Sequence, residues 1–189
     1  MTVTIPPKGQ YTIDPAQSSV TFTAKHQFGL ATVRGSFALR SGEIRVSKPV
    51  TASVVRVVVD AGSFASGNRT RDKQVKSATF LHVENHPNIT FESTGVRVDE
   101  AGDWTLHGTL TARGSAAPIE LAVADASVTG DELILTATTV VDRYAHDITA
   151  MKGMAGRRLW MSVQIRARRI TSIHTAPTDT AATDHEGHP

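Results

Sequence analysis

The sequence predicts an all-β fold, an antiparallel barrel of eight strands with one short helix across the barrel or its mouth. Apolar and polar residues alternate along eight segments, and this period of two is typical of half-buried strands. Gly, Asp and Asn residues that favour turns separate the segments. Strands with one apolar face need a second sheet or closure into a barrel, because otherwise their edges stay open.

The strand with the clearest alternation is Trp104–Ala112, in which Leu106, Gly108 and Leu110 share one face with the two terminal residues. The same period predicts seven further strands, at residues 19–26, 32–39, 53–60, 88–93, 118–124, 133–141 and 159–167. Eight strands closed on themselves leave an interior just wide enough for side chains or for one slender ligand.

Turns and the helix interrupt this pattern. We expect turns at Ser41-Gly42, at Gly95, and at residues 99–102 and 129–131. The segment 68–81 lacks alternation and contains helix-forming residues, which predicts one helix at about residues 69–77.

The chain of 189 residues is expected to form one domain. Residues 1–9 form a flexible lead-in, residues 10–170 form the barrel domain, and residues 171–189 form a disordered tail. The tail is rich in Thr, Ala, Asp and His and has no periodic pattern, so it cannot bury enough surface to offset the entropy of ordering.

Composition excludes several classes of protein. The 20 basic and 18 acidic residues nearly balance, and no basic run is long enough to indicate a nucleic-acid site. Because Cys is absent, disulfides and thiol chemistry are excluded. No apolar stretch has the length of a membrane span or of a signal-peptide core, so we expect a cytoplasmic protein with no integral membrane segment.

The inward faces of the strands supply the candidate ligand-binding residues. Small residues on these faces, Gly35, Gly108, Ala24 and Ala112, are expected to leave room inside the barrel. The residues expected to line a tunnel or its mouth are Phe22, Ala24, His26, Val33, Phe37, Val55, Val57, Val59, Phe80, Phe91, Leu106, Leu110, Leu121 and Val163. A filled core without a lumen stays the alternative, because alternation does not distinguish a wall from a core.

Polar residues offer weaker signals. Arg71 is a candidate contact for a polar head group, although a structural contact at the helix is the favoured interpretation. His82 and His86 have the spacing of a helical metal pair, but Pro87 follows and no third ligand has suitable spacing, so no metal site is predicted. Residues 143–147 are interpreted as a polar surface loop. The sequence contains no nucleophile, phosphate-binding or dinucleotide motif, so no catalytic residue or cofactor is predicted.

Several stretches, in order, resemble one family. They are YTIDPAQSSVTFTAKH at 11–26, VRGSF at 33–37, SGNRTRDKQVKSATFLHVENHPNITFEST at 66–94, HGTLTARGSAAPIEL at 107–121 and VDRYAHDI at 141–148. Together they resemble the YceI family of lipocalin-like polyisoprenoid-binding proteins. The resemblance implies an eight-stranded barrel around a deep apolar tunnel. It also implies a long isoprenoid ligand, such as a polyprenyl phosphate or a quinone. Where the family often has Phe-Gly after its late Arg loop, this chain has residues 144–147, YAHD.

The leading hypothesis is therefore a non-catalytic binding or carrier protein for an isoprenoid lipid. An alternative is a barrel enzyme that acts on a lipid and uses His26 or His146 as acid or base. A third hypothesis is a packed barrel that acts through its surface as an interaction module. The expected partner is the lipid and not a nucleic acid, and formation of a homodimer is left open at this point.

Overall fold

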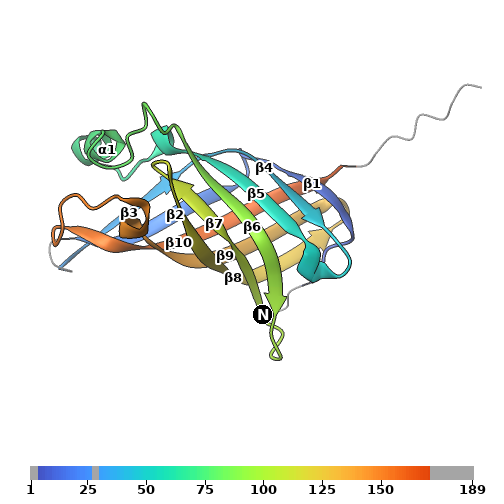
Figure 1. The fold of residues 1–189 in the computed structure, drawn as a ribbon. Coiled ribbons are helices and arrows are strands. Elements are labelled where there is room, and N and C mark those ends of the chain that lie inside the picture. The colour runs from blue at the N-terminus through green and yellow to red at the C-terminus, as the bar shows by residue number, and fades with distance from the viewer. Residues whose placement is uncertain (1–3, 27–29, 171–189) are drawn as a thin grey trace, which may run out of the picture.

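A computed structural model describes residues 4–26 and 30–170 of the chain; the predicted disordered tail lies outside the described residues. One antiparallel sheet of ten strand segments curls into a barrel, with the helix α1 (Arg69–Lys76) at one end (Figure 1). The segments are β1 (Gly9–Ile13), β2 (Ser19–His26), β3 (Ala31–Phe37), β4 (Leu39–Val46), β5 (Val54–Asp60), β6 (Asn88–Val98), β7 (Trp104–Ala112), β8 (Ser115–Thr129), β9 (Glu132–Asp142) and β10 (Ala155–Arg169).

The ten segments make eight strands around the barrel, as the sequence predicts. β1 and β2 lie one after the other along β10, with Ile13 opposite Ala167 and Ser19 opposite Gln164. The Asp14 carboxylate shapes the break between them by accepting hydrogen bonds from the N–H groups of residues 16 and 17. β3 and β4 are likewise one strand interrupted at residue 38.

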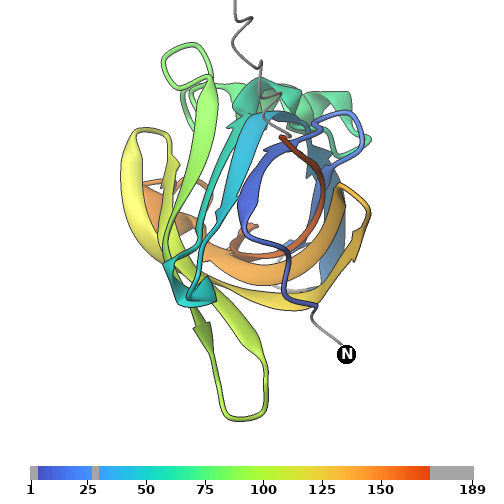
Figure 2. The same ribbon diagram turned by 90° about the vertical axis from the view of Figure 1, so that its right-hand side faces the viewer.

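The barrel closes through β1, a strand that the alternation does not predict. β1 pairs with β10 on one side and with β4 on the other, so Tyr11 lies opposite both Arg169 and Ile44. The view along the barrel in Figure 2 shows the resulting ring. Residues 4–8, which belong to the expected lead-in, run beside the barrel, and the Thr4 N–H donates to the Ala126 carbonyl over 2.9 Å.

Two of the predicted turns are wrong. Ser41 and Gly42 lie within β4, opposite Val58 and Val57, next to a shift in register. Gly95 lies within β6 after a similar shift, and the chain turns only at residues 99–103. Glycine marks bulges and close approaches as well as turns. Several strands, β8 above all, are longer than the alternation predicts.

Gly35 and Gly108 do not leave open space inside the barrel, which corrects the expectation. A Cβ atom at Gly35 would meet the Phe22 ring and the Ala65 carbonyl, and one at Gly108 would meet the Phe91 ring. Phe22 lies opposite Gly35 on the neighbouring strand. These glycines therefore make room for aromatic side chains of adjacent strands.

At the end that carries α1, a segment around residues 63–65 covers part of the edge of β3 that does not pair with β2. Ser36 and Ala65 exchange two main-chain hydrogen bonds of 2.8 and 3.0 Å, and the Ala38 N–H donates to the Ser63 hydroxyl over 2.7 Å. The predicted helix is present as α1, and the Asn68 side chain caps it by accepting from the Arg71 N–H. No helix among the described residues is long and apolar enough to cross a membrane.

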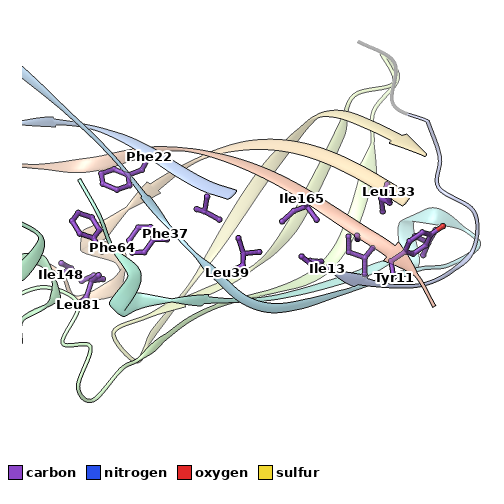
Figure 3. Packing of buried hydrophobic residues seen from close by; sticks show 14 of the residues in the cluster. Tyr11, Ile13, Phe22, Phe37, Leu39, Phe64, Leu81, Leu133, Ile148 and Ile165 are labelled. Carbon is purple, nitrogen blue, oxygen red and sulfur yellow. The ribbon is translucent and has the colours of Figure 1, made fainter. Parts of the chain in front are cut away.

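The opposite end of the barrel is solidly packed. Tyr11, Ile13 and Leu133 are 0%, 2% and 1% exposed, and they pack with Leu39 and Ile165 along the barrel axis (Figure 3). The main chain of β4 fits against this cluster because Gly42 has no Cβ atom. A Cβ atom at this position would collide with the Ile13 side chain. We call this cluster, Tyr11, Ile13, Leu39, Leu133 and Ile165, the packed end.

We predict that Leu133→Ala lowers the free energy of unfolding by about 2–5 kcal/mol, because the substitution opens a cavity in a closely packed region. Urea unfolding followed by circular dichroism measures the change. Val140→Ala on the same strand, where the side chain is 47% exposed, is the control and should shift stability by less than about 0.5 kcal/mol. Equal effects at both positions would contradict a packed end.

Candidate ligand-binding site

The half of the barrel below α1 is hollow. It encloses a cavity of about 300 Å³ that is lined almost entirely by hydrocarbon side chains. The walls reach inward to Val20, Phe37 and Val163, which lie in one row across adjacent strands, and the packed end begins beyond them. Met151 and Met154, both partly exposed, line the outer part with residues of α1. The cavity is thus open at one end and closed at the other.

Most of the residues predicted to line a tunnel contribute to this cavity. Val55 and Leu106 do not line it, although Leu106 is buried and Val55 packs against the core. His26 ends β2 opposite Ala155, and its side chain lies outside the described residues. The predicted residues that line the cavity are Phe22, Ala24, Val33, Phe37, Val57, Val59, Phe80, Phe91, Leu110, Leu121, Val163 and Arg71.

Three aromatic rings form part of the inner wall. Phe22 and Phe37 come from neighbouring strands, and Phe64 comes from the segment that covers β3 (Figure 3). The ring centroid of Phe64 lies 5.3 Å from each of the other two, a distance typical of favourable aromatic contacts. The sequence does not predict Phe64 as a wall residue, because it lies between strands, where no period assigns a side chain to a face.

Arg71 anchors the start of α1 and also lines the outer cavity. Its guanidinium donates to the Ser66 hydroxyl over 2.7 Å and to the Ser66 carbonyl over 3.2 Å. Ser66 in turn donates to the Asp72 carboxylate through its hydroxyl and its N–H. Because a guanidinium carries five N–H donors, Arg71 keeps donors beyond these two contacts. The structural contact is present, and contact with a ligand head group stays a prediction.

Arg143 holds together the connection between β9 and β10. It lies in the short 3-10 helix η3 (Arg143–His146), is 6% exposed, and lines the cavity. Burial lowers its pKa, while Tyr144 and Asp142 act in the opposite direction. The guanidinium donates to four main-chain carbonyls, those of Ile148, Ala150, Ala155 and Gly156. The interpretation of residues 143–147 as a polar surface loop is therefore wrong for Arg143.

His146 is the second buried polar residue of η3, and it is 3% exposed. Its Nδ1 lies 3.0 Å from the Ser115 carbonyl oxygen, and the residue lines the cavity. From the sequence, His146 is predicted only as a loop residue or as the acid or base of an alternative enzyme. Its burial follows from main-chain contacts of η3, which residue spacing does not encode.

His82 and His86 do not form a metal centre with other side chains. Their ring centroids are 5.7 Å apart in an edge-on arrangement. Within the described part of the chain, no group of three or more His, Asp, Glu or Cys side chains could hold a metal ion.

The fold agrees with comparisons to known proteins. The YceI-like domain family matches residues 11–168. The chain belongs to this family. Its fold resembles the crystal structure of BcnA from Burkholderia cenocepacia, with a TM-score of 0.72 and 17% identity over 82% of this chain and 98% of BcnA. It also resembles a polyisoprenoid binding domain from Saccharophagus degradans, with a TM-score of 0.64 and 15% identity over 85% and 98% of the two chains.

Curated relatives of this YceI-like chain include UPF0312 proteins. One from Vibrio parahaemolyticus is 36% identical over 107 residues, which cover 52% of this chain and 56% of that protein. One from Shewanella baltica is 36% identical over 115 residues, or 59% of each. The chain thus spans somewhat more than half the length of the curated relatives it matches.

We predict that Asp142 makes η3 sensitive to acid. Its carboxylate caps η3 by accepting from the Tyr144 N–H and pairs with Arg157 at 2.6 Å. The hydrogen bond from Arg157 is the main cause of its lowered pKa. The ion-pair contribution should be fully present above the ordinary Asp pKa and should be lost as pH falls through the lowered value.

Asp142→Asn keeps a capping side chain and removes only the charge, whereas Asp142→Ala should cost about 1 kcal/mol more through loss of the cap. Urea unfolding at neutral pH and at about pH 3 measures both effects. The difference between the native protein and the Asn variant should shrink at the lower pH, and a constant difference would refute the assignment.

Proposed function

We propose that this protein binds an isoprenoid-type lipid chain in the cavity and carries it without changing it chemically. One observation carries this proposal: a preformed apolar cavity enters the barrel from the α1 end and stops at the packed end. The similarity to a polyisoprenoid binding domain supports the ligand class.

The cavity wall suits a branched hydrocarbon. A linear isoprenoid is a narrow rod with methyl branches, and each CH₂-sized unit buried contributes about 0.8 kcal/mol. Val, Leu, Ile and Phe side chains from several strands surround the cavity, so methyl groups would meet apolar contacts on all sides. Such a site gains affinity from area and shape and needs few directed hydrogen bonds.

The volume of the cavity limits how much of the chain it holds. About 300 Å³ is at the lower end of the range for ligand cavities. We therefore expect one slender chain to enter tail first and to end against Val20, Phe37 and Val163. The polar head then lies toward α1 and η3, where Arg71 and His146 provide the polar atoms.

The geometry of His146 favours binding over catalysis. The hydrogen bond at Nδ1 goes to a main-chain carbonyl, not to a carboxylate that would stabilise a protonated ring during proton transfer. An enzyme that used this ring as acid or base would convert its lipid, whereas a carrier would return the lipid unchanged.

We predict that Leu110→Trp abolishes most lipid uptake, because the larger ring would occupy the cavity that Leu110 lines. Val57→Trp should act in the same way from another wall. Thr109→Trp, one residue away on the opposite face of β7, is the matched control and should bind normally. Titration with a fluorescent prenyl lipid measures uptake, with circular dichroism as the test of folding. Normal binding by both cavity variants would overturn the proposal.

Organic extraction of the purified protein followed by mass spectrometry should yield a lipid with an isoprenoid chain. After incubation with a defined prenyl lipid, the extract should contain that lipid unchanged. Recovery of a modified lipid would instead favour the enzyme hypothesis. Absence of bound lipid together with failure to take up any prenyl probe would favour a protein that acts through its surface.

A further inference from the structure

We infer that His146 accepts a hydrogen bond from a hydroxyl group on the ligand, so the preferred ligand is an isoprenoid alcohol or a quinol. This inference rests on the proposed function and narrows the chemistry of the head group. The relevant feature is a histidine that is 3% exposed, lines the cavity and uses one ring nitrogen for a main-chain hydrogen bond.

The hydrogen bond at Nδ1 fixes the chemical character of the other ring nitrogen. A carbonyl oxygen only accepts hydrogen bonds, so Nδ1 of His146 must carry the proton that it donates to Ser115 over 3.0 Å. In the neutral ring, Nε2 is then an acceptor with a free lone pair. The protein thereby presents an acceptor.

The surroundings of Nε2 leave this atom available to a ligand in the cavity. No described residue makes a hydrogen bond to Nε2. Every side-chain nitrogen or oxygen that is completely buried in the described part of the chain does have a hydrogen-bond partner, so Nε2 is not one of these completely buried atoms. Nε2 therefore has accessible surface. Because His146 is 3% exposed overall and lines the cavity, we assign that surface to the cavity.

The neighbouring Arg143 does not convert this region into an anion site. Four of its five N–H donors are already bound to main-chain carbonyls. A phosphate group would therefore have few free N–H donors to bind on Arg143. A quinone carbonyl can only accept a hydrogen bond, so it would form none with the Nε2 acceptor. A hydroxyl group supplies the proton that Nε2 can accept, and its remaining lone pairs can face Arg71 at the outer cavity.

The test compares two ligands that differ in whether the oxygen carries a proton or a methyl group. Geranylgeraniol and its methyl ether share the chain and the oxygen, but only the alcohol donates a hydrogen bond. We expect the full chain to bind the alcohol roughly tenfold more tightly than the ether, because the ether leaves a buried acceptor without a partner. Competition against a fluorescent prenyl probe measures both affinities.

His146→Asn is the matching protein variant. The Asn amide can still donate to the Ser115 carbonyl, but it does not extend to the position of Nε2. We expect this variant to bind the alcohol and the ether equally, because it has no acceptor at the position of Nε2. Urea unfolding serves as the check on folding, and if the variant does not fold, the comparison of the two ligands on the native protein decides the inference alone.

Each outcome separates this inference from the proposed function. Equal binding of alcohol and ether by the native protein, or a preference that survives in His146→Asn, would overturn the role of His146 and leave the lipid-binding proposal intact. Failure of both ligands to bind would overturn the proposed function itself. Tighter binding of geranylgeranyl phosphate than of the alcohol, lost in Arg71→Gln, would overturn the inference by assigning the head group to an anion site at Arg71.

Discussion

The main-chain hydrogen bonds of β1 are the interaction on which this barrel depends. Five residues lie between β10 and β4 and join the two ends of the sheet. Without them, two long strands would present unpaired edges. The side chains of Tyr11 and Ile13, on the same strand, pack in the packed end. One short segment therefore both closes the ring and fills part of the interior.

The two halves of the interior differ in how completely side chains fill them. The packed end buries its side chains almost completely and provides dispersion contacts on every side. The hollow end forgoes part of that stabilisation, because its walls face open space. Three sets of hydrogen bonds support the walls around the cavity. They are the bonds of Arg143 to main-chain carbonyls, the contacts of Ser66 with Arg71 and Asp72, and the bridge between Ser36 and Ala65.

The sequence could predict the barrel because alternation is strong where strands are long. Nine residues of β7 repeat the period without a break, whereas β1 offers only Tyr11 and Ile13, too few to separate a strand from a loop. The turn prediction is wrong at Gly42 and Gly95, because glycine occurs in bulges as readily as in turns.

The site was predictable only in part, for a similar physical reason. Alternation identifies which side chains point inward, as for Phe22 and Leu110, but it does not show at which level along the axis the interior is filled. Val55 points to the core yet lies outside the cavity. Arg143 and His146 are placed by hydrogen bonds to main-chain carbonyls, and no residue spacing in the sequence encodes such partners.

The closed inner end also has a kinetic consequence. A molecule seated in a cavity that is closed at its inner end must withdraw toward the α1 end, and a cavity of about 300 Å³ has little room for a second molecule beside it. Exchange of one guest for another is then a strict sequence of departure and arrival. Its rate is set by the departure of the first guest, however abundant the replacement.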